Sequence, residues 1–250
     1  MSGPNVHRDA RHMALAQVGA QGQERIAAAS ALVVGVGGLG CAAATYLASA
    51  GVGELSLVDF DTVDATNLGR QVLFGPDDIG EAKAAVAADR LAQQNPGIRI
   101  RAVTDRLDDS ALSEAVAKAD VVLDCTDNFA TRFQVSDACV EAARCLVSGS
   151  AIRLEGQLAI FGPDYEVSPC YRCLYTEADE SLLDCAGNGV FAPVPGVIGT
   201  MMAVEALKVL AGLDSPRGTL RLYEADSGNF HSVRIPKRPD CQACGQKRSQ

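Results

Sequence analysis

Two pairs of cysteines give the sharpest local signal of chemistry in the sequence. Cys170 and Cys173 are separated by two residues, and so are Cys241 and Cys244. Four thiolates at this spacing can complete a closed, tetrahedral structural zinc site, which would tie the C-terminal part of the chain to an irregular, core-poor segment. Two unrelated cysteine pairs are the alternative. A redox C-x-x-C is disfavoured because neither pair opens a thioredoxin-like βα unit.

A glycine-rich turn gives the second signal. The glycines at G-x-G-x-x-G spacing, with one more between them, are Gly35, Gly37, Gly38 and Gly40. Glycines at these positions let a backbone turn tightly and approach a phosphate, while the helix that follows offers free N–H groups to that anion. The pattern alone also fits a structural turn in another α/β protein, so its context decides.

The flanking segments give this turn the context of a nucleotide-binding β-α-β unit. Residues 31–36 and 55–58 are apolar and rich in β-branched or aliphatic side chains, as in buried parallel strands, and residues 41–50 form an Ala- and Leu-rich helix between them. The second strand ends at Asp59, followed by Asp61. An acid at that position can bind ribose hydroxyls, so the unit predicts a nucleotide site.

Three charged residues suit the phosphates of a nucleotide. Asp127 follows the buried strand predicted for residues 121–123, where a carboxylate can hold Mg²⁺ beside phosphates. The alternative for Asp127 is capping of the next helix. Lys83 and Arg70 are candidate phosphate cations, although each alone would be an ordinary surface charge. This set favours an ATP-binding site over a hydride-transfer site. A dehydrogenase commonly uses a histidine, tyrosine or lysine on its substrate, and here the three histidines lie near the termini, outside any motif.

The elements that position these residues alternate over the first 150 positions. Residues 81–94, 110–118 and 133–143 are predicted as helices, and residues 98–103, 121–123 and 145–148 as strands. This alternation predicts a mostly parallel sheet. After residue 151 the predicted elements are strands at 153–161, 220–223 and 231–235 and a helix at 196–210, whose Met201, Met202, Val204 and Leu207 we expect in the core. Antiparallel strands would then extend the same sheet.

Length and composition bound the function. The 250 residues are 48% hydrophobic with a net charge of −9, which argues against general nucleic-acid binding and against an anionic membrane surface. No stretch is expected to span a membrane, and the N-terminus has no apolar signal core, so we expect a cytoplasmic protein. In that reducing compartment, Cys41, Cys125, Cys139 and Cys145 are predicted to be buried small apolar residues.

The motifs together resemble the MoeB/ThiF/HesA family, the bacterial relatives of ubiquitin-activating enzymes. The resemblance runs from about residue 8 to 245 and rests on these in order: the glycine turn, Asp59-Phe60-Asp61, Asn67-Leu68-x-Arg70-Gln71, Lys83, Asp124-x-Thr126-Asp127-Asn128 and both C-x-x-C pairs. Residues 148–157 and 169–173 resemble the molybdopterin-synthase adenylyltransferase branch most closely. The resemblance implies a Rossmann-like fold and one adenylating domain over residues 1–250, with an N-terminal helical segment (1–30), a nucleotide-binding half (31–150) and a zinc-containing, carrier-binding half (151–250).

The resemblance also implies a reaction. In the family, ATP activates the C-terminal glycine carboxylate of a ubiquitin-like sulfur carrier ending in Gly-Gly, giving an acyl-adenylate and pyrophosphate. By this resemblance Asp59 would hold the ribose and Arg70 and Lys83 would neutralise phosphates. Asp127 would hold Mg²⁺, and Asn67 would assist at the phosphates. Asn128 and Asp61 belong to the same implied ATP site.

Arg11 matches a family arginine that reaches into the neighbouring subunit's nucleotide site, which implies a homodimer. Cys185 matches a cysteine that, in thiamine-pathway members, can bond covalently to the carrier. No sulfurtransferase domain follows Cys244, so we expect a separate sulfur donor.

Several alternatives stay open at this point. The same adenylation could serve a thiamine, tRNA-thiolation or cysteine-pathway carrier instead of molybdenum cofactor biosynthesis. A nicotinamide-dependent oxidoreductase fits the glycine turn but not the cysteine pairs or the Arg70 and Lys83 set. A non-catalytic carrier-binding scaffold is disfavoured by the intact Arg70, Lys83 and Asp127.

Overall fold

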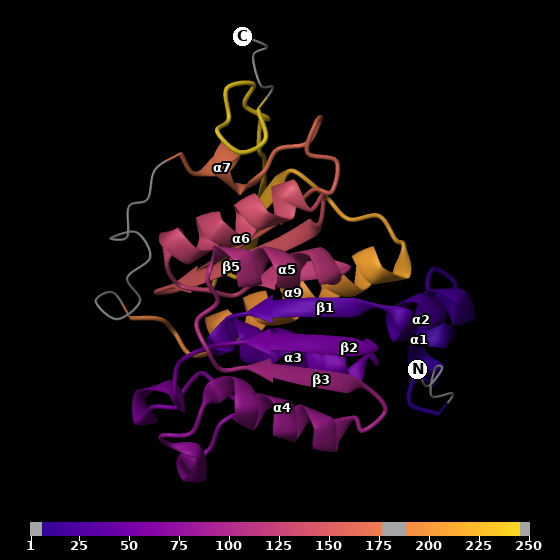
Figure 1. Cartoon of the computed structure of the whole chain (residues 1–250), viewed down its shortest axis with the longest axis vertical. Helices are drawn as coiled ribbons and strands as arrows, with labels where there is room; N and C mark the ends of the chain where they lie inside the picture. The colour runs from indigo at the N-terminus through magenta and orange to yellow at the C-terminus, as the bar shows by residue number, and fades with distance from the viewer. Residues whose placement is uncertain (1–6, 177–188, 246–250) are drawn as a thin grey trace.

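The protein is built on one central sheet of eight strands (Figure 1). The computed structural model describes residues 7–176 and 189–245. The strand order is β3-β2-β1-β4-β5-β6-β7-β8. The strands are β1 Ser30–Val34, β2 Glu54–Val58, β3 Arg99–Val103, β4 Val121–Asp124, β5 Cys145–Ile152, β6 Glu155–Phe161, β7 Thr219–Glu224 and β8 Asn229–Arg234. Strands β1 to β5 pair in parallel, and β6, β7 and β8 continue the sheet antiparallel. The predicted fold class is confirmed.

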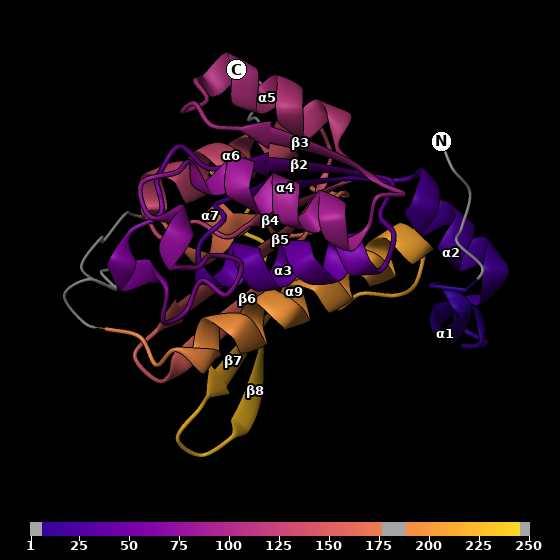
Figure 2. The ribbon, with the colours of Figure 1, turned by 90° about the horizontal axis from the view of Figure 1, so that it is seen from below.

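Helices cover both faces of the sheet, as the edge-on view in Figure 2 shows. The face with α3, α4 and α9 packs against alternate strand residues such as Val33 and Leu57, and the face with α5 and α6 packs against their neighbours, such as Leu32 and Val34. This alternation follows from the two-residue repeat of a strand, and burial on both faces explains the nearly continuous apolar runs. The helices are α3 Gly38–Ser49, α4 Lys83–Gln94, α5 Asp109–Lys118, α6 Phe129–Glu141 and α9 Pro193–Ala211.

Shorter elements complete the described chain. They are the helices α1 Ala10–Met13, α2 Gly19–Ala28 and α7 Tyr171–Leu174, and the 3₁₀ turns η1 Ala65–Asn67 and η2 Pro76–Asp78. Helices α1 and α2 lie at the end of the sheet where β1 begins, opposite the carboxyl ends of the parallel strands (Figure 1).

Several boundaries differ from the sequence prediction by a few residues, and the starts of two helices differ for local reasons. Helix α6 begins at Phe129, one turn earlier than predicted, because the Asn128 side chain caps it by accepting a hydrogen bond from Thr131 N at 2.9 Å. Helix α9 begins at Pro193 rather than residue 196, because a proline is compatible with the first helical position.

Helix α9 bears on two further expectations and corrects one of them. Among the described helices it is the one long and apolar enough to cross a membrane, with 19 residues and a mean hydropathy of 1.5. In the fold it lies across the sheet and against α3, with Met202 fully buried, as expected of a core helix. Val204 was expected in the core but is 51% exposed, because it lies on the side of the helix turned away from the sheet.

Candidate functional site

The glycine turn connects β1 to α3 at the carboxyl edge of the parallel strands. Gly35 has a φ of +88°, and a Cβ there would lie 3.0 Å from the Cys125 backbone. A Cβ on Gly40 would lie 2.0 Å from the Gly35 carbonyl oxygen. Gly37 and Gly38 line a cavity at this edge. The turn therefore requires glycine for conformation and for close backbone packing, and it places the N-terminus of α3 beside the cavity.

Asp59 fixes this turn to the end of β2. Its carboxylate accepts hydrogen bonds from Val36 N at 2.7 Å and from Asp61 N at 2.9 Å. Burial raises the pKa of the Asp59 carboxyl above its ordinary value, although these amide bonds and Lys83 act in the opposite direction. Asp59 therefore lies at the cavity wall with its orientation fixed by two backbone groups.

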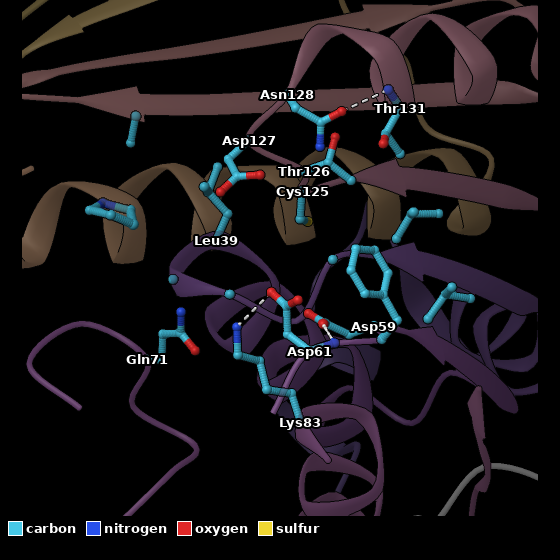
Figure 3. Close-up of a pocket in the computed structure, with 18 of the residues that line it drawn as sticks. Leu39, Asp59, Asp61, Gln71, Lys83, Cys125, Thr126, Asp127, Asn128 and Thr131 are labelled. Carbon is cyan, nitrogen blue, oxygen red and sulfur yellow. Dashed lines mark hydrogen bonds and ion pairs between the residues drawn. The ribbon is translucent and has the colours of Figure 1, made fainter. Parts of the chain in front are cut away.

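Two cations line the cavity near Asp59. Lys83, the first residue of α4, is 8% exposed at its side chain, and its Nζ lies 3.2 Å from an oxygen of Asp61, which is 56% exposed (Figure 3). Arg70 is half-buried and donates to the carbonyl of Thr66 at 2.9 Å. Because the Lys83 ammonium is largely removed from water, an anion in the cavity would interact with it strongly.

A second wall of the cavity carries Asp127 and Asn128, which follow β4 (Figure 3). Asn128 caps α6, so the alternative of Asp127 as the helix cap does not hold. The Asp127 carboxylate is exposed and lies across the cavity from Lys83 and Asp61 (Figure 3). Oxygen ligands in such an open position suit Mg²⁺ shared with a nucleotide.

A buried polar network holds the loop that carries Asp127. Asp124, fully buried at the end of β4, accepts hydrogen bonds from Thr126 N at 3.1 Å, from Thr126 Oγ1 at 2.7 Å and from Ser148 Oγ at 3.2 Å. Arg132, 3% exposed, donates to the carbonyls of Thr126 and Gly149. The loop is thus bonded both to its own strand and to β5.

Most of the residues selected from the sequence meet around this one cavity. Those that line it are Gly35, Gly37, Gly38, Asp59, Asp61, Arg70, Lys83, Asp127 and Asn128. Gly40 packs behind the turn, against Gly35. Asn67 accepts a hydrogen bond from Asp64 N at 3.3 Å and completes a capping box of η1. Arg11 is exposed on α1, by the opposite end of the sheet.

Other cavity residues were not selected from the sequence. Gln71 is 4% exposed, and its side-chain oxygen has no hydrogen-bond partner within the described structure. The Arg106 guanidinium lies over the Phe60 ring, 4.3 Å from its centroid, and both line the cavity. Pro195 brings the start of α9 to the same wall. Gln71 and Phe60 stand inside motifs that were recognised, but their approach to the cavity depends on the chain path.

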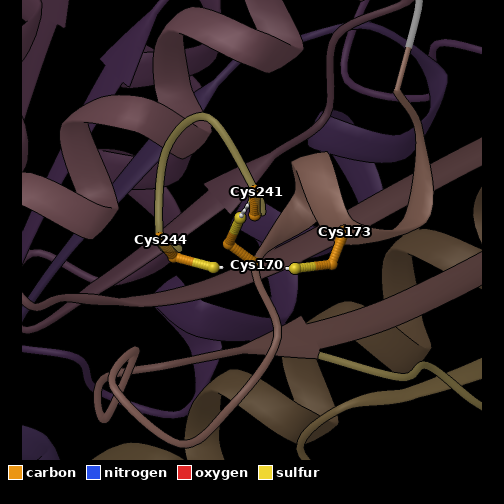
Figure 4. Close-up of side chains that lie close together, drawn as sticks. All are labelled: Cys170, Cys173, Cys241 and Cys244. Carbon is orange, nitrogen blue, oxygen red and sulfur yellow. Dashed lines mark hydrogen bonds between the residues drawn. The ribbon is translucent and has the colours of Figure 1, made fainter. Parts of the chain in front are cut away.

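The four cysteines of the two C-x-x-C pairs form one cluster, with their sulfurs directed toward one another (Figure 4). All four sulfurs lie within 4.8 Å of one another, and the Cys170–Cys241 and Cys173–Cys244 sulfurs are both 3.6 Å apart. A tetrahedral zinc with Zn–S bonds of about 2.3 Å sets neighbouring sulfurs about 3.8 Å apart. The geometry therefore fits a zinc ion, and the alternative of two unrelated pairs is wrong.

The remaining cysteines separate clearly from this cluster. Cys41, Cys125, Cys139 and Cys145 are buried, which confirms the prediction. Burial raises the pKa of the Cys41 thiol to about 12 and that of Cys145 to about 11, so both are protonated at neutral pH. Cys185 lies outside the described residues.

Comparison with known proteins gives this arrangement a family context. The ThiF family profile matches residues 10–243. The molybdopterin-synthase adenylyltransferase of Escherichia coli is 47% identical over 226 residues, covering 90% of this chain and 90% of that protein. The sulfur carrier protein ThiS adenylyltransferase of the same organism is 43% identical over 245 residues, covering 98% of this chain and 97% of that protein.

A longer relative and a solved structure extend the comparison. The bovine adenylyltransferase and sulfurtransferase MOCS3 is 46% identical over 251 residues, which cover 99% of this chain but 55% of that protein. The crystal structure of E. coli MccB with ATP matches with a TM-score of 0.83 and 26% identity, covering 96% of this chain and 75% of that one. Because the family profile matches residues 10–243 and the two E. coli adenylyltransferases are 43% and 47% identical over nearly their whole length, the chain belongs to the ThiF family.

Proposed function

We propose that this protein uses ATP to adenylate the C-terminal glycine carboxylate of a ubiquitin-like sulfur carrier, giving an acyl-adenylate and pyrophosphate. The observation that supports it most is that the buried Lys83 lies across one cavity from the exposed Asp127, and that Arg70 and the glycine turn line the same cavity. The adenylyltransferase names of the relatives and the likeness to ATP-bound MccB support it. These relatives give no support to a nicotinamide-dependent oxidoreductase.

The work of the protein in this reaction is neutralisation and alignment of two anions. The backbone N–H groups of the glycine turn and of the N-terminus of α3 would donate hydrogen bonds to phosphate oxygens, and Asp59 would accept hydrogen bonds from the ribose hydroxyls. Lys83 and Arg70 would offset the charge that builds on the α-phosphate and on the departing pyrophosphate, as the carrier carboxylate approaches in line. Because both cations are held in the free protein, little reorganisation is needed.

Asp127 would hold Mg²⁺ in this scheme, with Asn128 beside it. Bound there, Mg²⁺ would neutralise phosphate oxygens and orient the nucleotide. The hydrogen bonds that Asp124 and Arg132 make to the Asp127 loop would keep that carboxylate facing the cavity.

We further propose structural zinc at Cys170, Cys173, Cys241 and Cys244. A closed four-thiolate site leaves no position for substrate, so the metal would stabilise the fold rather than act in the reaction. It would join the segment after β6 to the C-terminal segment after β8.

The partners form part of the same proposal. We expect a homodimer in which Arg11 of one subunit completes the nucleotide site of the other, and a separate protein that donates sulfur. A covalent role of Cys185 with the carrier stays a proposal. We expect a cytoplasmic location, and neither nucleic acid nor membrane as a partner. Molybdenum cofactor biosynthesis is the favoured pathway, with thiamine, tRNA-thiolation or cysteine-pathway carriers as the alternatives.

The test is ATP–pyrophosphate exchange with each Gly-Gly-ending carrier from the same genome. Asp127→Ala should abolish carrier-dependent exchange, whereas Asp89→Ala, on the exposed face of α4, should retain it. The carrier that supports exchange would identify the pathway. Absence of exchange with every carrier, despite ATP binding, would reject carrier adenylation and favour a carrier-binding scaffold.

A further inference from the structure

Lys237 lies beside the cysteine cluster and uses all three of its N–H donors there. Its Nζ is 2.6 Å from the carbonyl oxygen of Tyr165, 2.6 Å from that of Cys244 and 3.1 Å from the Cys244 sulfur. A lysine ammonium has three donors and no acceptor, so each donor has a partner. The side chain is half-buried, unlike a solvated surface lysine.

The contact falls on the least buried of the four cysteines. Cys170, Cys173 and Cys241 are buried, whereas Cys244 is only partly so. Four thiolates carry more negative charge than one zinc ion offsets, and a cation at a coordinating sulfur reduces that excess. Lys237 supplies such a charge directly at the sulfur of Cys244, the least buried of the four.

The same lysine joins the cluster to the body of the fold. Tyr165 is buried, and its hydroxyl donates to the Arg144 carbonyl at 2.8 Å, beside the start of β5. Through Lys237, the turn that carries Cys244 is tied to this anchored segment. The orientation of Cys244 is therefore restrained from outside the four ligands.

We propose that Lys237 is a positioning residue of the metal centre, which holds Cys244 in its ligating orientation and slows loss of the metal. This inference rests on the proposed zinc site. It predicts that removal of the ammonium loosens one ligand and leaves the nucleotide cavity unchanged.

Arg238 offers a matched control next to Lys237. Its backbone N–H lies 3.5 Å from the Cys173 sulfur, while its guanidinium pairs with the exposed Asp240 at 3.3 Å. Arg238→Met removes a nearby positive charge but keeps the backbone contact. It therefore separates a general charge effect from the direct contact that Lys237 makes.

The experiment measures zinc content and the rate of zinc transfer to a chromogenic chelator, with thermal unfolding followed in parallel. We expect Lys237→Met to release zinc about 10- to 100-fold faster than wild type, because loss of a residue that supports a metal ligand lowers metal affinity by about that factor. Arg238→Met should stay within about twofold, because it loses no contact to a ligand sulfur. Lys237→Arg keeps the positive charge but loses the three donors that converge from one nitrogen. If Lys237→Met does not fold, the rate of zinc release from Lys237→Arg is compared with that from Arg238→Met instead.

Equal release rates for the Lys237 and Arg238 variants would overturn the role of Lys237 while leaving the zinc site intact. Wild-type protein that binds no zinc would overturn both the metal site and this inference. Neither result bears on adenylation, which is measured separately by exchange.

Discussion

Lys83 is a buried cation in the lining of the cavity, and its replacement gives the first prediction. Lys83→Met should lower pyrophosphate exchange by about 100-fold or more, because a buried, pre-positioned cation is lost from the site of charge development. Stability should change little, since Asp61 is more than half exposed and stays hydrated. Exchange kinetics and thermal unfolding measure the two effects.

The control for Lys83 is Lys118→Met. Lys118 pairs with Glu114 on the surface of α5, and both side chains are about two-thirds exposed. Exposed pairs of this kind contribute about 0–1 kcal/mol to the free energy of unfolding, so stability should change little. Lys118 does not line the nucleotide cavity, so exchange should be unchanged. A Lys83→Met enzyme that retained exchange within threefold of wild type would remove Lys83 from the reaction.

Gln71 gives a second prediction at this scale, in which stability and activity move in opposite directions. Its buried side-chain oxygen has no partner in the free, described structure, and an unsatisfied buried group of this kind costs about 1–3 kcal/mol. Gln71→Leu should therefore leave stability unchanged or raise it, yet weaken binding of nucleotide or carrier about tenfold. Denaturant unfolding and titration calorimetry measure both. A loss of stability together with unchanged binding would make Gln71 a purely structural residue.

A site residue can be predicted from the sequence when a local pattern next to it marks its position. Asp59, Lys83 and Asp127 were found because each follows a local signal, either a strand end or a helix start. Gln71, Arg106 and Pro195 reach the cavity only through the path of loops between elements. Side-chain direction was equally hidden, since no local pattern shows that Asn67 turns toward its own 3₁₀ turn.

At the scale of elements, Glu205 anchors α9 to the neighbouring strand. It is 2% exposed and lies 2.8 Å from both Lys208 and Arg221, with Ser215 donating at 2.7 Å. Burial raises the pKa of Glu205, but hydrogen bonds from Lys208 and Ser215 lower it, and the resulting pKa lies below the ordinary value of 4.5. Because Arg221 lies on β7, this carboxylate fixes the helix whose first turn reaches the cavity.

Glu205→Gln should therefore destabilise the protein at neutral pH by about 2–4 kcal/mol, slightly less than the loss of a fully buried partner, because its cations keep some contact with water. A carboxyl with a lowered folded-state pKa stabilises the protein above its unfolded pKa, and that contribution is lost as pH falls through the folded value. The difference between variant and wild type should narrow below pH 4.5. Denaturant unfolding at pH 7 and pH 3.5 tests this, and a constant difference would contradict it.

Elements themselves were predictable where hydrophobic periodicity and local signals agreed. The strands from β1 to β4 and helices α3 and α4 match the predicted segments within a few residues. For β1, β2 and β4 the reason is burial in the middle of the sheet, which leaves an apolar run that few other structures explain. The sequence predicts the start of α6 one turn too late, because the pattern marks Asn128 as a site residue and not as the helix cap. Val204 was misplaced because α9 is apolar nearly all round, so its sequence does not mark the exposed side.

At the scale of the whole molecule, the position of Arg11 bears on oligomerisation. Helix α2 leads into the start of β1, while the cavity lies beyond the end of β1, and the five residues of that strand alone span about 16 Å. Helix α1, which carries Arg11, therefore lies at the opposite end of the parallel strands from the cavity of the same subunit (Figure 1). If it takes part in adenylation, the natural recipient is the cavity of a second subunit, as in a composite dimer site.

Complementation between two inactive variants tests this arrangement. Arg11→Ala and Lys83→Met should each lack exchange, but co-expressed subunits should regain it, because the mixed dimer holds one cavity with both an intact Lys83 and the partner's intact Arg11. With random pairing, half of the dimers contain one subunit of each variant. One of the two cavities in each mixed dimer is intact, so about one quarter of wild-type activity is expected. Lys83→Met co-expressed with Asp127→Ala should regain none, since each defect disables its own subunit's cavity. If the first pair also stays inactive while dimers form, Arg11 does not act across the interface, and the composite site is rejected.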